Sequence, residues 1–262
     1  LTFNMDPARA PSAVTARTRA LLPVDLYGQV AATEALDALA GERGLALVWD
    51  CAQSAGASRH GKRAGGWGTT PCFSFQPTKN LGACGDAGIV VTDDPALAAR
   101  IRVLRNHGAE AMNAHVLLGI KSHMDALQAA ILGAKLPHLD AWNARRAEVA
   151  ALYGELLQGM DEVQVPRAEP AGVHVFHKYT VLVDRRDELG RYLWEREIRA
   201  DVYYDPPLHL QPCFAFLGYA RGDLPVTERV ASRVLSLPIF PEMTSEQVQA
   251  VAGAIRTFYA RK

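Results

Sequence analysis

Residues 45–57 decide the fold class, and they read Leu45-Ala46-Leu47-Val48-Trp49-Asp50-Cys51-Ala52-Gln53-Ser54-Ala55-Gly56-Ala57. The apolar run 45–49 is typical of a buried strand, and it ends in an acidic residue followed by small and polar residues. Because ligands of open α/β sheets lie at the carboxyl ends of the strands, Asp50 is placed where it can face a ligand. Taken alone, an Asp that only hydrogen bonds within the next turn is the more common case.

A second strand runs into a polar turn at residues 73–82, Phe73-Ser74-Phe75-Gln76-Pro77-Thr78-Lys79-Asn80-Leu81-Gly82. A lone lysine there would be interpreted as a solvated loop residue. Asp50 precedes Lys79 by 79 − 50 = 29 residues, and each follows a strand. Pyridoxal phosphate (PLP) chemistry needs an amine for a Schiff base, a carboxylate at the pyridine nitrogen and donors for the phosphate. The two segments together supply all three, with Ser74 as the hydroxyl.

Strands and helices alternate in the first half of the chain, and helices dominate the second. Apolar patterns predict strands at 20–26, 45–49, 72–75, 88–91, 175–183 and 200–204. They predict helices at 30–39, 95–105, 124–136, 142–157, 186–197, 226–234 and 245–259, the last capped by Thr244-Ser245. This order predicts an α/β domain with a largely parallel sheet over residues 1–140 and a smaller C-terminal α/β domain over 141–262.

Composition and charge exclude several classes of partner. Hydrophobic residues make up 49% and charged residues 21% of the 262, which is ordinary for a globular protein. Because 28 basic residues balance 28 acidic ones, no bulk attraction to nucleic acid or an anionic membrane is expected. No apolar run is long enough to span a membrane, and no signal peptide is recognisable. The four cysteines lack metal-site spacing and favour reduced thiols in a cytoplasmic protein, with no metal site.

The motifs resemble those of the DegT/DnrJ/EryC1/StrS family of PLP-dependent sugar aminotransferases, which are fold-type-I PLP enzymes. Residues 50–57 are similar to the family's Asp-x-Ala-Gln-x-x-Gly-Ala motif, and residues 73–88 to its Phe-Ser-Phe-x-x-x-Lys-Asn…Gly-Asp-x-Gly motif. Similar stretches in the same order are residues 23–29, 104–108, 124–130 and 237–243. The resemblance implies an aspartate-aminotransferase-like fold, with an N-terminally incomplete large domain followed by a smaller C-terminal α/β domain.

The resemblance also implies roles for individual residues. Lys79 is expected to bind PLP as a Schiff base and then to move the proton during amino transfer. Asp50 is expected to pair with the pyridinium nitrogen, Gln53 to lie against the hydroxyl side of the ring, and Ser74 to hold the phosphate. The implied reaction transfers an amino group from glutamate to a keto sugar attached to a nucleotide, in amino-sugar biosynthesis. A homodimer with a shared active site is expected.

Two histidines are weaker candidates for contacting the substrate. His209 lies in the segment 206–211, which the resemblance places near the substrate mouth, although a structural loop histidine is the alternative. His177 flanks the start of the predicted strand 175–183, where an ordinary edge histidine is the safer interpretation.

The chain departs from the family pattern in three places. The family usually has a longer N-terminal part, which supplies a phosphate-binding turn and an aromatic residue that stacks on the ring, so we expect a truncated or partial chain. Lys121 and His123 stand where Asn and Arg are common, and in relatives that Asn reaches the phosphate of the neighbouring subunit's cofactor. Asp25 stands where His is frequent.

Two alternatives to an aminotransferase remain open. PLP-dependent sugar dehydratases of the same family replace the Schiff-base lysine with His, and Lys79 argues against that function. A catalytically incompetent, truncated paralogue with a dimerisation or regulatory role is favoured by the short N-terminus and by Lys121. The retained Lys79, Asp50, Gln53 and Ser74 argue against it.

Overall fold

The computed structural model describes residues 2–170 and 172–261 of the chain, which form two compact units. The first unit comprises Thr2–Asn143 and Ala168–His177, and the second comprises Ala144–Arg167 and Lys178–Lys262. The helix α5 (Leu139–Leu157) runs from the first unit into the second, near the boundary expected at residue 140. Residues 168–177, expected in the C-terminal domain, belong to the first unit because β10 (Gly172–Val173) pairs with β3 (Ser58–Arg59) there.

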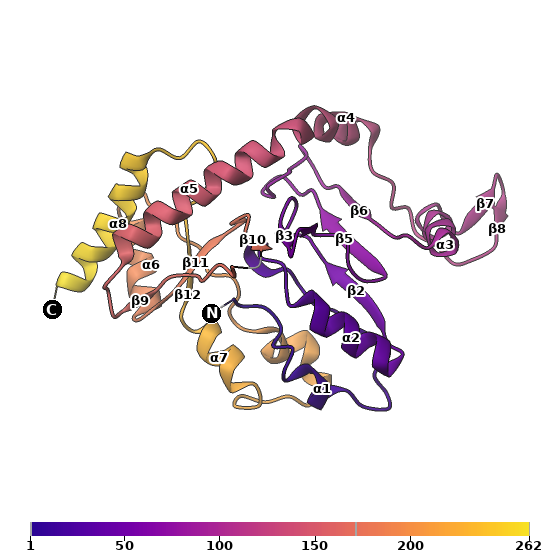
Figure 1. Ribbon diagram of the computed structural model, residues 1–262, viewed down its shortest axis with the longest axis horizontal. Helices are drawn as coiled ribbons and strands as arrows, with labels where there is room; N and C mark the ends of the chain where they lie inside the picture. The colour runs from indigo at the N-terminus through magenta and orange to yellow at the C-terminus, as the bar shows by residue number, and fades with distance from the viewer. Residues whose placement is uncertain (1, 171, 262) are drawn as a thin grey trace. The chain divides into compact units, whose positions relative to one another are not determined.

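The first unit is built around a four-stranded sheet with the strand order β1-β2-β5-β6 (Figure 1). Its elements are α1 (Ala10–Ala13), β1 (Ala20–Leu21), the 3₁₀ helix η1 (Leu26–Gly28), α2 (Thr33–Arg43), β2 (Ala46–Asp50), β3, β4 (Lys62–Arg63), β5 (Thr70–Ser74), β6 (Gly88–Val90), α3 (Pro95–Arg105), β7 (Ala109–Ala111), β8 (Ala114–His115), α4 (Ala126–Lys135), η2 (Leu136–His138) and β10. β1, β2 and β5 are parallel, and only β6 runs antiparallel to its neighbour. The carboxyl ends of β2 and β5 therefore share one edge of the sheet.

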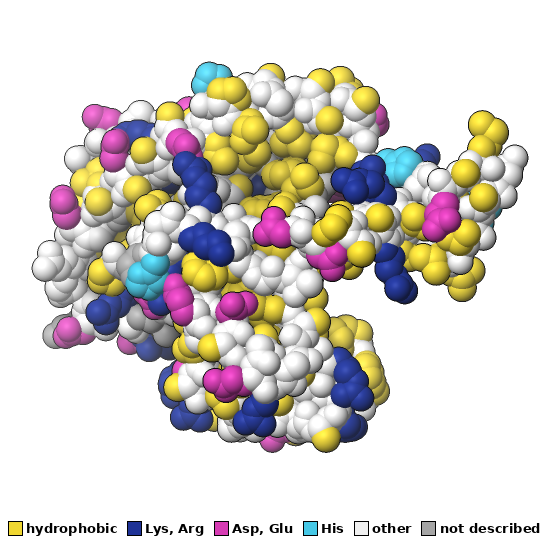
Figure 2. Space-filling view, turned by 45° about the vertical axis from the view of Figure 1, so that its right-hand side comes forward, with side chains coloured by type: hydrophobic (Ala, Val, Ile, Leu, Met, Phe, Trp, Pro, Cys, Tyr) yellow, Lys and Arg dark blue, Asp and Glu magenta, His cyan; other side chains and the backbone are white. Residues whose placement is uncertain are grey.

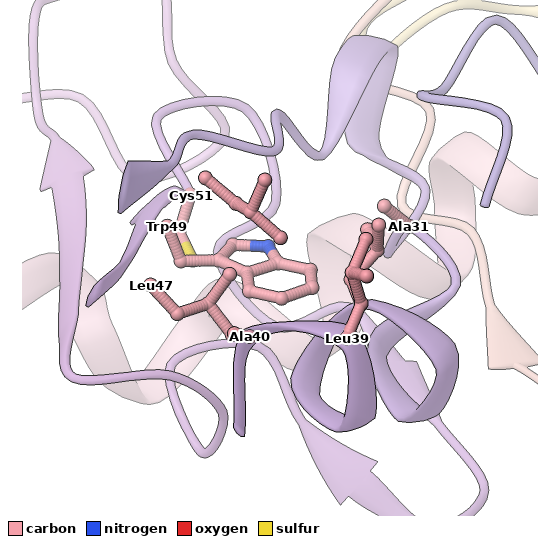
Figure 3. Packing of buried hydrophobic residues seen from close by; sticks show 8 residues of the cluster. Ala31, Leu39, Ala40, Leu47, Trp49 and Cys51 are labelled. Atoms are coloured by element: carbon pink, nitrogen blue, oxygen red, sulfur yellow. The ribbon is translucent and has the colours of Figure 1, made fainter. Parts of the chain in front are cut away.

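The core beside this sheet is organised by Trp49, which is 1% exposed. Figure 3 shows its indole ring lying between β2 and α2, close to Leu39 and Ala40. Alternate residues of β2 are buried because successive side chains of a strand point to opposite faces. Trp49 also donates a hydrogen bond from Nε1 to Oδ1 of Asp25, at 2.7 Å. The packing thus fixes the strand that ends in Asp50.

The second unit is an antiparallel sheet of order β12-β11-β9 with helices packed on it. Its elements are the main part of α5, β9 (Val163–Gln164), β11 (Tyr179–Val183), α6 (Arg186–Trp194), η3 (Leu208–Leu210), η4 (Pro212–Leu217), α7 (Pro225–Ala231), β12 (Val234–Leu237) and α8 (Ser245–Ala260). All five residues of β11 are buried. Thr244 caps α8, and Gln247 completes a capping box, as the predicted N-cap implied.

Three elements predicted in the second half differ in the structure. The strand expected at 175–183 begins only at Tyr179, because the N–H of Val175 donates instead to the carbonyl of Gly28 in the first unit. The strand expected at 200–204 is reduced to one bridge between Asp201 and Ser236. The helix expected at 226–234 ends at Ala231, and the apolar run that follows is β12, since periodicity cannot distinguish a short buried strand from a helix end.

Across residues 2–170 and 172–261, none of the helices combines the length and the apolar character needed to cross a membrane. The four cysteines are free thiols, Cys51 buried, Cys72 half-buried, and Cys84 and Cys213 exposed.

Candidate active site

Asp50 and Ser74 lie at the shared carboxyl edge of β2 and β5. Asp50 is the last residue of β2 and pairs in register with Cys72 of β5, and Ser74 follows two residues later on the same face as Cys72. Oδ1 of Asp50 accepts the N–H of Ala52 at 2.9 Å. Among the described residues, nothing donates to Oδ2 of Asp50. One oxygen of the carboxylate is therefore held in a turn, and the other is available to a ligand.

Lys79 follows β5 in a turn that hydrogen bonds hold closed. The N–H of Lys79 donates to the carbonyl of Gln76 at 2.8 Å, and both the N–H and Oγ1 of Thr78 donate to Oε1 of Gln76, at 2.9 and 2.5 Å. Gly82 closes the loop, since a Cβ there would collide with the carbonyl of Pro77. The sequence supplies a rigid turn rather than a flexible loop.

The amine of Lys79 is half-buried, and no described residue forms a hydrogen bond or ion pair with its Nζ. Desolvation lowers the pKa of Lys79, and the nearby carboxylate of Asp50 raises it by a smaller amount, so that the net pKa lies below the ordinary value. This shift favours the neutral, nucleophilic form of the amine. A lysine with a lowered pKa near an unpaired carboxylate oxygen is typical of a functional site.

Gln53 is buried, and its orientation is set by the backbone of η1. Its Oε1 accepts the N–H of Tyr27 at 2.6 Å, and Tyr27 has a positive φ of 59°. Gly28 follows with φ 104°, and a Cβ at this position would meet the backbone N of His177. The side chain of Gln53 is therefore held where the segments around residues 27 and 177 meet.

Asn80 connects the lysine turn to His177, a connection that no signal in the sequence predicted. Asn80 is 7% exposed, and its Nδ2 donates to Oδ1 of Asn143 at 2.8 Å and to the carbonyl of Val175 at 2.9 Å. Its Oδ1 lies 3.2 Å from Nδ1 of His177, which is 4% exposed. His177 is thus a buried histidine joined to the residue that follows Lys79, rather than the edge histidine that we expected.

Asp25 is a second buried polar residue whose role the sequence did not reveal. Its Oδ1 accepts the N–H of Ala31 and Nε1 of Trp49, and its Oδ2 accepts the hydroxyl of Ser54 at 2.7 Å. Burial raises the pKa of Asp25, and these hydrogen bonds partly offset the rise. The carboxylate ties the start of α2 to the turn that follows Asp50, so Asp25 supports the site without entering it.

The remaining candidates lie elsewhere. His209 belongs to the second unit, where its Nε2 is 3.1 Å from Oε1 of Glu228, an oxygen that also accepts the N–H of Leu224. Its contact with substrate stays a prediction. Lys121 and His123 are exposed at the base of the β7–β8 hairpin, where Lys121 forms a backbone bridge with Asn106.

The residues of the carboxyl edge fit PLP by their chemistry. Lys79 offers an unpaired amine of lowered pKa, Asp50 offers a carboxylate oxygen without a donor, and Ser74 offers a hydroxyl at the end of the neighbouring strand. A Schiff base, a pyridinium nitrogen and a phosphate need these three groups. In the described part of the chain, no group of three His, Cys, Asp or Glu side chains is arranged to hold a metal ion.

Known proteins match this chain over nearly its whole length. The model of the DegT/DnrJ/EryC1/StrS aminotransferase family matches residues 1–256. The chain is 48% identical over 99% of its length to a pleiotropic regulatory protein of Geobacillus stearothermophilus, of which it covers 70%. It is 44% identical over 98% of its length to dTDP-3-amino-3,4,6-trideoxy-alpha-D-glucose transaminase of Streptomyces venezuelae, and covers 68% of that protein.

Solved structures share the fold. The S. venezuelae DesV structure, a complex with a ketimine intermediate, matches 99% of this chain and 70% of its own, with a TM-score of 0.95 and 44% identity. The Bacillus subtilis NtdA structure, with bound cofactor PMP, matches 98% of this chain and 60% of its own, with a TM-score of 0.87 and 30% identity. These matches confirm the fold class that the motifs implied.

Proposed function

Because the chain belongs to the DegT/DnrJ/EryC1/StrS family of PLP-dependent aminotransferases, we propose that it transfers an amino group from glutamate to a keto sugar carried on a nucleotide. The observation that supports this most is the half-buried amine of Lys79, which has a lowered pKa and interacts electrostatically with Asp50. The reaction belongs to amino-sugar biosynthesis, as the names of the transaminases among the relatives indicate.

Each residue of the edge has a separate task in this proposal. When bound, PLP supplies an aldehyde that joins amino groups and a ring that withdraws electrons. Asp50 would hold a proton on the ring nitrogen through its Oδ2, and Ser74 would donate its hydroxyl to the phosphate. Gln53, held by the N–H of Tyr27, would lie against the hydroxyl side of the ring. Together the three side chains would orient the cofactor toward Lys79.

Lys79 supplies the amine and then the base. Its lowered pKa makes the neutral form of the amine more populated than in an ordinary lysine. Once the amino donor has displaced it, the free amine removes a proton from the donor's α-carbon and returns a proton at the cofactor's carbon. The closed turn of residues 76–79 would hold the backbone of Lys79 in place while its amine acts.

The substrate is proposed from the relatives together with the two histidines. A relative from Acidithiobacillus ferrooxidans, 45% identical, is named UDP-N-acetyl-3-dehydro-alpha-D-glucosamine 3-aminotransferase. With the S. venezuelae transaminase, it supports a dTDP- or UDP-linked keto sugar as the class of substrate. His177 and His209 are proposed to contact it. We also propose that the protein is located in the cytoplasm, together with nucleotide-linked sugars.

The absorbance of the protein with added PLP tests the proposal. We expect a visible band that Lys79→Ala lacks and that glutamate bleaches. Lys62→Ala, which removes an exposed lysine of β4, should keep both the band and the bleaching. Transfer to a dTDP- or UDP-linked keto sugar should then yield the amino sugar, detected by mass spectrometry. Absence of the band would instead support a regulatory paralogue without catalytic activity. The Geobacillus relative, which is named a pleiotropic regulatory protein, is consistent with that alternative.

The β7–β8 hairpin supports the further proposal of a homodimer. Met112, Leu118 and Ile120 are 92%, 99% and 67% exposed. Figure 2 shows hydrophobic side chains along this arm, and Figure 1 shows the arm standing away from the sheet of its own unit. Such exposed apolar patches mark interaction surfaces. By the family resemblance, Lys121 would then take the place of the Asn that in relatives reaches the neighbouring subunit's cofactor phosphate.

Molar mass in solution tests the dimer. We expect the mass of two chains for the wild type. The double variant Met112→Asp, Leu118→Asp should have the mass of one chain, because burying two carboxylates in an apolar contact is unfavourable. Glu110→Gln, an exposed change on the same hairpin, is the control and should remain dimeric. A wild type with the mass of one chain would contradict the proposal.

A further inference from the structure

The orientation of the side-chain amide of Asn80 is fixed by two partners that can only accept hydrogen bonds from it. Nδ2 of Asn143 donates to the carbonyl of Ala55 at 3.0 Å, so Oδ1 of Asn143 must be an acceptor. The carbonyl of Val175 can only accept. Both acceptors lie within 2.9 Å of Nδ2 of Asn80. Exchanging the amide oxygen and nitrogen of Asn80 would place oxygen against oxygen at both contacts, so this orientation alone satisfies them.

This orientation determines the proton position on His177. Because Oδ1 of Asn80 is an acceptor, the ring nitrogen 3.2 Å away must carry hydrogen. His177 is therefore protonated on Nδ1, and in the neutral ring Nε2 is an acceptor rather than a donor.

His174, three residues earlier, has the opposite tautomer. The N–H of Phe176 donates to Nδ1 of His174 at 3.0 Å, so the proton of the neutral ring lies on Nε2. Burial lowers the pKa of His174 to about 3, which keeps the ring neutral. One short segment thus holds two buried histidines whose protons lie on different nitrogens, each set by a different neighbour.

The side chain of Asn80 also anchors the turn that carries Lys79. On its N-terminal side, Lys79 is held by the local hydrogen bonds to Gln76. On its C-terminal side, the next residue is tied through its side chain to α5 at Asn143 and to the backbone at Val175. These anchors lie in segments far apart in the sequence, so the position of the lysine depends on the packing of the whole first unit.

We propose that Asn80 is a positioning residue of the amino-transfer site, which holds the Lys79 turn through its Nδ2 and fixes His177 as the Nδ1–H tautomer through its Oδ1. The proposal rests on the proposed function for the lysine, whereas the tautomer of His177 follows from the hydrogen bonds alone. The two tasks use different atoms of one amide and can be separated by substitution.

Long-range ¹H–¹⁵N spectra of the full chain with labelled histidine test the tautomer, before and after PLP is added. We expect His177 on Nδ1–H and His174 on Nε2–H in the wild type. In Asn80→Ala, the share of His177 in the Nδ1–H form should fall, whereas His174 should keep its tautomer, which makes His174 an internal control. A wild-type His177 on Nε2–H, or an unchanged His177 in the variant, would overturn the proposal.

Cofactor affinity, measured by the visible band, tests the anchor. Asn80→Asp keeps an acceptor for His177 but removes both donors, so His177 should keep a proton on Nδ1, in the neutral or the doubly protonated ring, and PLP should bind about tenfold more weakly because buried hydrogen bonds are lost. Asn80→Ala should lose both properties. Thr180→Val removes a buried hydrogen bond of the second unit and should change neither. Normal affinity in Asn80→Asp would overturn the anchoring role. If the wild type binds no PLP, the proposed function fails while the tautomer result stands.

Discussion

The two units of the chain fill their interiors in different ways. In the described part of the first unit, buried polar side chains gather around the edge that carries Lys79, and they include Asp25, Gln53, Ser54, Asn80, Asn143, His174 and His177. The second unit is largely apolar inside, with β11 buried along its whole length and α6 packed against α8. Among the described residues, both units bury charged or polar groups, and those of the first lie near the half-buried amine of Lys79.

The two kinds of interior have different consequences, one for the stability of the fold and the other for the positions of side chains. An apolar contact stabilises a fold in proportion to its area and tolerates small displacements. A buried hydrogen bond depends on direction and is costly when one partner is lost. We infer that the second unit contributes mainly packing energy, whereas the first gives up part of that energy for fixed side-chain directions. Substitutions in the two units should therefore separate unfolding from loss of cofactor binding.

The largest effect on stability is expected from the core of the second unit. Ile255 of α8 is fully buried, and Ile255→Ala should lower the free energy of unfolding by about 2–5 kcal/mol, because the cavity adds to the lost burial. Urea denaturation measures this change. Gln249→Ala, an exposed change on the same helix, is the control and should alter stability by less than about 0.5 kcal/mol. An equally small effect of Ile255→Ala would contradict the apolar-core interpretation.

A smaller effect is expected from His174, and it depends on pH. Burial lowers the pKa of His174 to about 3, whereas the unfolded chain protonates near the model value of 6.5. The unfolded state therefore binds more protons between these values, so this contribution to stability is present above pH 6.5 and is lost as pH falls toward 3. Between pH 7 and pH 5 the loss is about 2 kcal/mol.

The variant His174→Leu should reduce the dependence of the unfolding free energy on pH, whatever it does to stability at pH 7. Thermal unfolding at several pH values measures it. The exposed His123→Gln should keep the wild-type slope. If wild type and His174→Leu lose stability in parallel on acidification, His174 is not the group that responds.

The smallest effect is expected from Lys79 in the cofactor-free protein. Desolvation lowers the pKa of Lys79, so the folded state releases its proton before the unfolded state does. Lys79→Met should raise the melting temperature slightly at pH 7, and the gain should shrink as pH rises through the lowered pKa of the folded state and vanish above 10.5, where the lysine is neutral in both states. Water screens the half-exposed amine and keeps the effect small. A variant less stable than wild type at pH 7 would show that the amine is stabilising.

The sequence predicted the elements whose signals are local. Asp94 and Pro95 begin α3 and the predicted bounds 95–105 agree with the structure, because capping depends on residues a few positions apart. Thr244 and Gln247 form the capping box of α8 for the same reason. The strand 200–204 and the helix end at 234 were wrong, since apolar runs of similar length serve both structures and only the neighbouring strand decides.

By itself, the sequence determined which chemical groups this protein has and in which order the strands present them. Asp50, Ser74 and Lys79 were proposed as site residues because each lies at or after the end of a strand and because their spacing and chemistry are specific. Only the tertiary structure decided the partners of Asn80, which lie 63, 95 and 97 residues away, and with them the proton position on His177. A hydrogen bond depends on distance and direction between atoms that chain closure brings together, and the residue order alone does not contain this information.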